Sequence, residues 1–275
     1  MNPEIVAVVR HALDEDIGSG DVTSEACIPA ELTASGVFIA REAQVVAGIE
    51  LLSVIYDLRG GVGRLEIRKC SGERATAGEV IAEVEGRART LLSCERVALN
   101  FLQRLGGVAT LAAKYVEQVA GTSCKVLDTR KTTPGLRRLE KMAAAAGGVT
   151  NHRMGLYDAI LIKNNHITAA GGVRQAMEAA RHASTLPIEI EVRTRAELEE
   201  ALQAGASHLL LDNFDPATAA ELVRAIDGRA KVEISGGVTL QNVRAYAQTG
   251  ADYVSSGAIT HSAVAVDISF RCHSI

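Results

Sequence analysis

The stretch from residue 188 to residue 213, IEIEVRTRAELEEALQAGASHLLLDN, contains the unit from which most of the chain is built. Its two ends, IEIEVR (188–193) and HLLLDN (208–213), are short apolar segments of the kind that form buried strands. The residues between them, 194–204, have a helical pattern. Short apolar strands that alternate with helices predict a parallel sheet with right-handed crossovers.

The same unit recurs on both sides of this stretch. Further strands are predicted at 124–130, 159–164, 231–235 and 253–257, and further helices at 137–146, 172–184, 216–226 and 240–248. Six such units favour a short α/β barrel, with an open doubly wound sheet as the alternative. No GxGxxG follows the first strand, which counts against a dinucleotide-binding fold.

The first part of the chain has a different pattern. Alternating segments bounded by glycine predict a small antiparallel sheet, with strands within 34–48, 63–72 and 78–86. Helical patterns flank them at 3–15, 49–58 and 88–105. The change of pattern predicts two domains, 1–107 and 108–275, with a C-terminal tail that can return to the first domain.

Composition excludes several classes of partner. The 275 residues include 29 Lys+Arg and 33 Asp+Glu, a net charge of −4, so the chain lacks the basic surplus typical of proteins that bind nucleic acid or anionic membranes. Aromatic residues are 3% and there is no Trp, so a base-stacking platform is not expected. No apolar run reaches the roughly 18 residues of a membrane span.

The cysteines and the N-terminus bear on localisation. The five cysteines contain no CxxC pair, which predicts neither a disulfide framework nor a zinc site. We interpret them as reduced and mostly buried thiols of a cytoplasmic protein. The first residues lack the basic start and long apolar region of a signal peptide.

Polar residues stand at the carboxyl end of every predicted strand of the repeat: Asp128, Arg130, Lys163, Glu191, Asp212, Ser235 and Gly257. In barrels and open α/β sheets these ends meet on one face, where the ligand binds. One such charge by itself is as well explained by solvent exposure or a salt bridge. Charges on four or more strands favour a binding site.

The residue types at these ends indicate the chemistry of the ligand. The cationic or protonatable side chains predict a polyanionic ligand: Arg130, Lys131, His152, Arg153 and Lys163. Glu191 and Asp212 suit a divalent metal, sugar hydroxyls or a developing positive charge. The late segments SGGV (235–238) and SSGA (255–258) suit a phosphate.

Two long segments, DTRKTTPGLRRLEK (128–141) and GGVTNHRMGLYDAILIKNNHI (147–167), resemble the quinolinate phosphoribosyltransferase family. The likeness extends, in the family's order, over EDIGSGDVT (15–23), ERVALNFLQRL (95–105) and the later strands, and so covers nearly the whole chain. The chain departs from the family's common pattern at Val149, Asn164, Arg193 and Ile234.

The resemblance implies a fold and a reaction. The fold is an N-terminal α/β sandwich domain joined to an incomplete α/β barrel of the type II phosphoribosyltransferase kind. The enzyme, a pentosyltransferase, converts quinolinate and 5-phosphoribosyl-1-pyrophosphate to nicotinate mononucleotide, pyrophosphate and carbon dioxide, with Mg²⁺, in NAD biosynthesis. The family's homodimers, which can form higher assemblies, share their active sites between subunits.

The resemblance also implies residue roles. Those for quinolinate are Arg130, Lys131, His152, Arg153, Lys163 and, from the partner subunit, Arg104. Those for 5-phosphoribosyl-1-pyrophosphate are Lys131, Lys163, Glu191, Asp212, Ser235, Gly236, Gly237, Ser256 and Gly257. The resemblance implies catalytic roles for Lys163, Glu191 and Asp212. It also implies that Glu191 and Asp212 bind the metal ion, either directly or through water or substrate. Without the resemblance, Arg104 is best explained as a solvated helix-end arginine.

Two other functions fit part of the pattern. One is an isomerase or aldolase that uses Lys163 as a base or Schiff-base amine, which does not require Arg104, Arg130 and Arg153 together. The other is a silent relative that only binds a pyridine carboxylate or phosphosugar. The presence of both Glu191 and Asp212 argues against it, because anion binding alone is easier without carboxylates.

Overall fold

The fold is described from a computed structural model, which describes residues 2–274. The chain forms two compact units. The first contains the residues up to Ala113, Thr132–Gly148 and the residues from Ser262 on, and the second contains Lys114–Lys131 and Val149–His261. The boundary expected at residue 107 falls inside one long helix, α4 (Ala88–Val119).

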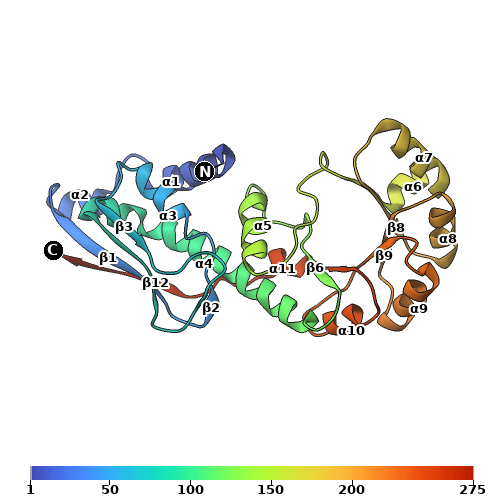
Figure 1. Cartoon of the computed structure of the whole chain (residues 1–275). Helices are drawn as coiled ribbons and strands as arrows, with labels where there is room; N and C mark the ends of the chain where they lie inside the picture. The colour runs from blue at the N-terminus through green and yellow to red at the C-terminus, as the bar shows by residue number, and fades with distance from the viewer. Residues whose placement is uncertain (1, 275) are drawn as a thin grey trace. The chain divides into compact units, whose positions relative to one another are not determined.

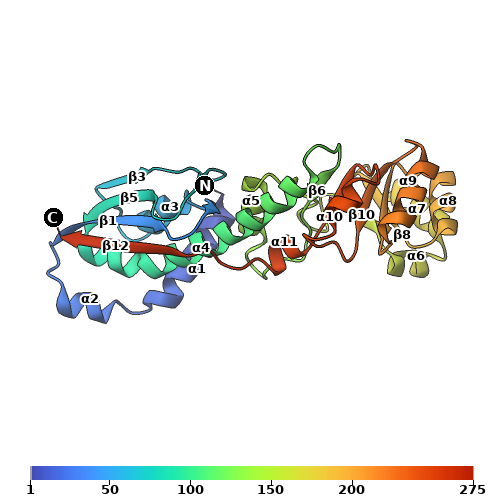
Figure 2. The same ribbon diagram turned by 90° about the horizontal axis from the view of Figure 1, so that it is seen from below.

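An antiparallel sheet in the order β12-β1-β5-β3 forms the centre of the first unit, with α4 running beside it (Figure 2). Its strands are β12 (Ile268–Ser274), β1 (Thr33–Ala40), β5 (Val80–Arg87) and β3 (Arg64–Ile67). The C-terminal strand β12 pairs with β1, and the ring centroids of Phe38 and Phe270 lie 4.8 Å apart. Gly36 makes room for the Phe270 ring, because a Cβ there would lie 2.1 Å from Phe270 Cζ. The sequence had predicted three of these strands but not β12.

The helices predicted at 3–15, 49–58 and 88–105 are present in the first unit, which also contains α5 (Arg137–Ala146), a helix predicted as part of the barrel repeat. The other helices of this unit are α1 (Pro3–Ile17), α2 (Val22–Cys27), α3 (Leu51–Asp57) and the first part of α4; a short sheet pairs β2 (Gln44–Val45) with β4 (Arg74–Ala75). Asn2 caps α1 and Pro3 opens it, and Ile5, Val9 and Leu13 are buried at four-residue spacing. Helix α2 was not predicted.

Helix α4 continues through Gly106 and Gly107, beyond the end expected at residue 105. The C-terminal segment crosses the helix here: Val266 N–H donates to Gln103 O (3.1 Å) and Gln103 Nε2 donates to Ile268 O (2.8 Å). A Cβ on Gly107 would lie 2.1 Å from Val264 O. The two glycines therefore cost helix propensity but allow the two backbones to approach closely.

The second unit is an incomplete α/β barrel, as predicted. Its parallel sheet has the order β6-β11-β10-β9-β8-β7. The strands are β6 (Lys125–Leu127), β7 (Ile160–Ile162), β8 (Ile188–Val192), β9 (His208–Asp212), β10 (Lys231–Ser235) and β11 (Tyr253–Ser255). The first two strands of this unit, β6 and β7, are at opposite edges of the sheet, so the barrel is open between them. Beside β6, Thr150 forms one parallel bridge with Leu127.

Helices surround this sheet on its outer side, where α7, α8 and α9 are seen in Figure 1. They are α6 (Asn164–Ala170), α7 (Val173–Ala183), α8 (Arg195–Gln203), α9 (Pro216–Ile226), α10 (Val243–Ala247) and α11 (Ala258–His261). Ile190, Val192, Leu209 and Leu211 are fully buried at alternating strand positions. Alternation places the other residues of β8 and β9 toward the barrel interior.

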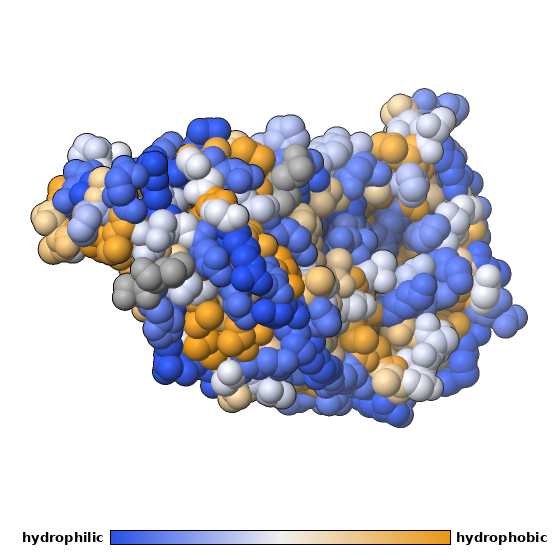
Figure 3. Space-filling view, turned by 60° about the vertical axis from the view of Figure 1, so that its left-hand side comes forward, coloured by the Kyte–Doolittle hydropathy of each residue, from blue (hydrophilic) through white to orange (hydrophobic). Residues whose placement is uncertain are grey.

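The surface is mixed in polarity, and most of the cysteines lie on it. The face drawn in Figure 3 is mostly hydrophilic, with several hydrophobic patches within it. No helix among residues 2–274 combines the length and apolarity needed to cross a membrane. The expectation that the cysteines are mostly buried is wrong: Cys27, Cys70 and Cys272 are exposed, and only Cys94 and Cys124 are buried. Burial raises the pKa of the Cys94 thiol to about 11 and that of Cys124 to about 12.

Candidate active site

A cavity of about 470 Å³ lies at the carboxyl ends of the barrel strands, entirely within the second unit. Every predicted site residue except Arg104 lines it: Arg130, Lys131, His152, Arg153, Lys163, Glu191, Asp212, Ser235, Gly236, Gly237, Ser256 and Gly257. These residues are spread over more than 120 positions of the chain, and the parallel strands bring them together. The cavity therefore has the location that the strand-end pattern predicts.

The barrel interior contributes carboxylates that the sequence interpretation missed. Glu189 and Glu191 alternate on β8 with the buried Ile190 and Val192, and Glu233 occupies the equivalent inward position on β10. Glutamates at every second position of an otherwise apolar strand are the signal that could have identified them. Such positions cannot face the outer helices without a large desolvation cost, so they face the polar cavity side.

His152 connects this acidic interior to the cavity. Its Nε2 lies 3.1 Å from Glu189 Oε2 and 3.3 Å from Glu233 Oε2. Burial of the ring opposes its charge, but the two carboxylates outweigh burial and raise the pKa of His152 to about 10. The backbone N–H of Arg153 donates to His152 Nδ1 at 2.7 Å, which requires an unprotonated Nδ1. Protonation of the ring would place two hydrogens between these nitrogens, so the Arg153 peptide group must rotate away when the ring becomes charged. In both forms Nε2 carries a hydrogen directed at the carboxylates.

Asp128 positions the segment that carries His152 and Arg153. Its carboxylate is fully buried and accepts hydrogen bonds from Asn151 Nδ2 (2.7 Å) and His152 N–H (2.8 Å). Asp128 follows β6, so these bonds hold the segment beside the open edge of the barrel. This residue was predicted as part of the strand-end pattern, and it holds the backbone of His152 and the side chain of Asn151.

The remaining cations reach the cavity from loops. Lys163 follows β7 directly and is the residue before α6, with its backbone N–H donating to His166 Nδ1 (2.9 Å). Arg153 donates from Nη1 to Ala159 O (3.0 Å). Burial, followed by the nearby Arg130 charge, lowers the pKa of Arg153 from its usual value. This repulsion between two guanidinium groups is relieved by a bound anion.

The last strands end in a small, backbone-rich surface suited to phosphate. Ser235 and Ser255 follow in register on β10 and β11, and their hydroxyls lie 3.0 Å apart. Gly236 has a φ of +89°, and a Cβ there would lie 2.3 Å from Asn213 Oδ1. A Cβ on Gly257 would lie 2.7 Å from Lys131 Cδ. Position 236 therefore requires glycine, whereas a side chain at Gly257 would displace that of Lys131; the two glycines leave backbone N–H groups accessible to a ligand.

Two carboxylates in the cavity are suited to a divalent metal. Glu191 and Asp212 offer hard oxygen donors from neighbouring strands, the ligand type that Mg²⁺ prefers. Arg193, one of the positions at which the chain departs from the family's common pattern, lies beside this pair, with its Nε 3.6 Å from Glu191 Oε1. Within residues 2–274, the tight group of potential metal ligands is instead His152, Glu189 and Glu233, in which the His152 ring contacts both carboxylates.

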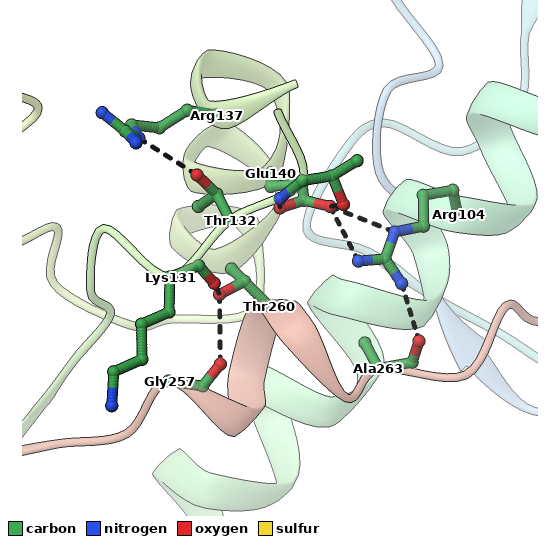
Figure 4. Close-up of polar contacts among 9 residues, drawn as sticks. Arg104, Lys131, Thr132, Arg137, Glu140, Gly257, Thr260 and Ala263 are labelled. Atoms are coloured by element: carbon green, nitrogen blue, oxygen red, sulfur yellow. Dashed lines mark hydrogen bonds and ion pairs between the residues drawn. The ribbon is translucent and has the colours of Figure 1, made fainter. Parts of the chain in front are cut away.

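Arg104 lies elsewhere, in the first unit, and does not line the barrel cavity. It projects from the middle of α4, where its guanidinium donates to Glu140 of α5 and to Ala263 O (Figure 4). Together with residues of α1, α4 and α5, it lines a second cavity of about 170 Å³. The explanation of Arg104 as a helix-end arginine is therefore wrong, because α4 continues for 15 residues beyond it.

Comparison with known proteins covers almost the whole chain. The family models "Quinolinate phosphoribosyl transferase, N-terminal domain" and "Quinolinate phosphoribosyl transferase, C-terminal domain" match residues 21–106 and 108–271. Nicotinate-nucleotide pyrophosphorylase [carboxylating] of Mycobacterium leprae is 41% identical over 267 residues, 94% of each chain. Quinolinate phosphoribosyltransferase [decarboxylating] 1b of Nicotiana tabacum is 38% identical over 98% of this chain and 82% of its own.

A solved structure agrees with the sequence relatives. The crystal structure of NadC from Streptococcus pyogenes superposes with a TM-score of 0.95 at 38% identity, covering 100% of this chain and 99% of that one. The cationic side chains that line the barrel cavity and the similarity over the full length of the chain agree with one another. The chain belongs to the quinolinate phosphoribosyltransferase family.

Proposed function

We propose that this protein transfers the phosphoribosyl group of 5-phosphoribosyl-1-pyrophosphate to quinolinate with decarboxylation, and so yields nicotinate mononucleotide, pyrophosphate and carbon dioxide for NAD biosynthesis. One observation carries the proposal: a single cavity combines Arg130, Arg153 and Lys163 with Glu191, Asp212 and the glycine segments of the last strands. Cations suit the carboxylates and pyrophosphate, the glycines suit the 5-phosphate, and the carboxylates suit the sugar.

In this proposal the loop cations bind and orient quinolinate. Arg130, Arg153 and His152, with Lys131 and Lys163 close by, contact its two carboxylates. Guanidinium forks can bind carboxylates bidentately and fix the plane of the pyridine ring. An orientation that directs the ring nitrogen at ribose C1 is worth as much as about 7–11 kcal/mol of the activation barrier.

The carboxylates act on the sugar. Breaking the bond from ribose C1 to pyrophosphate leaves oxocarbenium-like charge on the ribose. Glu191 and Asp212 stabilise that charge directly or through the ribose hydroxyls, and Lys131 and Lys163 bind the leaving pyrophosphate. Ser235, Gly236, Gly237, Ser256 and Gly257 hold the 5-phosphate, so the sugar is fixed at both ends.

Decarboxylation follows from the substrate once its nitrogen is bonded to ribose. When the C2 carboxylate leaves as carbon dioxide, its bonding electron pair stays on C2, where the adjacent positively charged ring nitrogen stabilises it, and a proton delivered in the cavity then takes the place of the carboxylate on C2. Strong ion pairing to that carboxylate would hinder its departure, so we propose the tightest cationic contacts for the C3 carboxylate, which stays in the product. The protein's task at the C2 position is to exclude water and to position the group.

Mg²⁺ is part of the proposal. Glu191 and Asp212 would hold it, directly or through water or substrate, because both offer oxygen donors in the cavity. When bound, the ion would supply charge neutralisation for the pyrophosphate leaving group.

We also propose that the enzyme is a cytoplasmic homodimer, or a higher assembly of such dimers, in which Arg104 serves the partner's site. Arg104 lines a cavity in the first unit and not the barrel cavity of its own chain, which supports a role in a neighbouring subunit. Five unpaired thiols are typical of a reducing compartment.

The test is direct. The protein, quinolinate, 5-phosphoribosyl-1-pyrophosphate and Mg²⁺ are incubated and nicotinate mononucleotide is measured, with nicotinate in place of quinolinate as the control. Nicotinate lacks the C2 carboxylate and leaves cations unpaired, which costs several kcal/mol. Its kcat/KM should be lower by at least about 100-fold. Comparable turnover of both acids would contradict the proposal.

A further inference from the structure

We propose that Glu140 is a positioning residue, which fixes the guanidinium of Arg104 in the orientation that binds quinolinate. The inference rests on the proposed function, because it assumes that Arg104 contacts this substrate. It assigns a role to a buried glutamate of α5 that lines neither cavity. Figure 4 shows the arrangement of Arg104, Glu140 and Ala263.

Glu140 is a completely buried carboxylate with a full set of partners. Its Oε1 accepts from Arg104 Nη2 (2.7 Å), Arg104 Nε (3.1 Å) and Thr133 Oγ1 (2.7 Å). Its Oε2 accepts from Thr133 N–H (2.9 Å). A buried carboxylate with four donors has a single low-energy orientation, and it therefore imposes that orientation on the arginine.

The arginine is fixed from a second direction. Nη1 donates to Ala263 O (2.7 Å), so acceptors contact two different parts of the planar guanidinium. The segment that carries Ala263 approaches α4 closely because Gly107 has no side chain. The two acceptors set the plane of the guanidinium before any ligand binds. The side chain therefore loses little further rotamer entropy when it binds a ligand.

Exposure separates the roles of the two residues. The Arg104 side chain is 27% exposed and lines the cavity of about 170 Å³, whereas the Glu140 side chain is 0% exposed. A ligand can therefore reach the arginine but not the glutamate. Any effect of Glu140 on substrate must act through Arg104 or through Thr133, which stands two residues after Lys131 of the barrel cavity.

Three variants distinguish these routes. Glu140→Gln keeps the shape of the side chain; with its amide oxygen toward Thr133 N–H, its NH2 group faces the Arg104 guanidinium, so both the charge and the hydrogen bonds that orient Arg104 are lost. Thr133→Val removes the hydroxyl contact to Glu140 and leaves the ion pair. Arg104→Ala removes the proposed quinolinate ligand. Each is assayed for kcat and for the KM of each substrate, and its folding is checked by thermal unfolding.

We expect Glu140→Gln to raise the KM for quinolinate by about tenfold or more, with little change in the KM for 5-phosphoribosyl-1-pyrophosphate. Thr133→Val should leave both values near those of the wild type. The double variant Arg104→Ala/Glu140→Gln should be no worse than Arg104→Ala, since both changes break one interaction. Equal effects on both substrates, or additive losses in the double variant, would overturn the inference.

A mixed dimer tests the route independently. In a co-expressed, doubly tagged dimer of Glu140→Gln and Lys163→Ala chains, an effect through Arg104 falls on the site that already lacks Lys163. The other site keeps both groups, so the quinolinate KM should match that of a wild-type/Lys163→Ala dimer. A KM as high as that of the Glu140→Gln homodimer would show that Glu140 acts on its own chain's site, and would overturn the inference.

Two further readouts separate the possible failures. If the wild type makes no nicotinate mononucleotide from quinolinate, the proposed function fails before any variant is compared. If Glu140→Gln does not fold, Glu140→Asp replaces it; the carboxylate is retained but withdrawn from Arg104, and the quinolinate KM should again rise selectively. An active wild type with an unchanged quinolinate KM in Glu140→Asp and Glu140→Gln contradicts the inference alone.

Discussion

His152 in the barrel and Arg104 in the first unit are two protonatable groups held by carboxylates, but the carboxylates do different things. His152 lies between Glu189 and Glu233, and these partners shift its protonation, since the ordinary pKa of histidine is near neutrality. Arg104 is charged in any surroundings. Glu140 therefore cannot change its charge and can only fix its orientation.

The comparison shows how the fold determines which kind of control is possible. The carboxylates around His152 come from inward positions of β8 and β10, which a barrel packs around a shared interior. The carboxylate at Arg104 comes from one helix packed beside another, α5 beside α4, and is fully buried. The first arrangement adjusts charge at the cavity, and the second sets the geometry of a single side chain.

The largest expected effect is a loss of kcat when a carboxylate that acts on the substrate is neutralised. It distinguishes Glu191 and Asp212 from carboxylates, such as Glu140, that contact cationic side chains of the protein. Asp212→Asn and Glu191→Gln should each lower kcat by roughly 100-fold or more, with a small change in KM, because their charge matters most in the cationic transition state. Steady-state kinetics with both substrates measure this. A change confined to KM would place these two residues with Glu140, among the groups that orient rather than stabilise.

The next effect concerns a cavity cation that, unlike Arg104, is assigned to the site of its own chain. Arg130→Ala should raise the quinolinate KM by about 10–100-fold, the cost of losing a charge-assisted bidentate contact. Arg130→Lys should restore only part of the loss, because an ammonium lacks the planar fork. Full activity of the lysine variant would show that bidentate contact is unnecessary at this position.

A smaller effect tests the charge control at His152 directly. Glu189→Gln should lower the pKa of His152 from its raised value, because one of the carboxylates that outweighs burial is removed. In the wild type the raised pKa contributes stability that is present below the unfolded pKa and is lost as pH rises toward about 10. NMR titration of the His152 ring carbons measures this pKa in the wild type and in Glu189→Gln. A wild-type ring that is neutral at pH 7 would show that the Arg153 N–H at Nδ1 prevails over the carboxylates.

The sequence identified the repeating barrel and most of the cavity, because both depend on local patterns. Each strand and each strand-end residue is visible within a few positions, and the parallel fold then assembles them. Helices α2, α6 and α11 were missed, since elements of four to seven residues contain too few periodic positions. Strand β12 and the contact between Arg104 and Glu140 depend on distant partners, which no local pattern contains.

Glu189 and Glu233 were missed for a different reason. Both are visible as charged residues inside apolar strands, but they stand before the strand ends on which the prediction was based. The cysteine prediction failed because it relied on the average burial of cysteine, which says nothing about positions such as Cys70 in an exposed turn. Alternation within a strand is thus more informative than residue type alone.

The last prediction concerns the backbone crossing that brings Ala263 to Arg104. A Cβ on Gly107 would lie 2.1 Å from the backbone oxygen of Val264, whereas one on Gly106 would meet a side-chain methyl of Val266 at 2.8 Å. A side chain can move aside at lower cost than a backbone. Gly107→Ala should therefore destabilise the protein by about 2 kcal/mol or more, even though alanine favours the helix by roughly 1 kcal/mol. Gly106→Ala, in the same helix, is the matched control with a smaller loss of stability, and chemical denaturation measures the free energy of unfolding of both variants.

Because the displaced segment also carries Ala263, Gly107→Ala should raise the quinolinate KM modestly. Equal stability of the two variants would show that the crossing adjusts without strain, and that Glu140 alone orients the arginine.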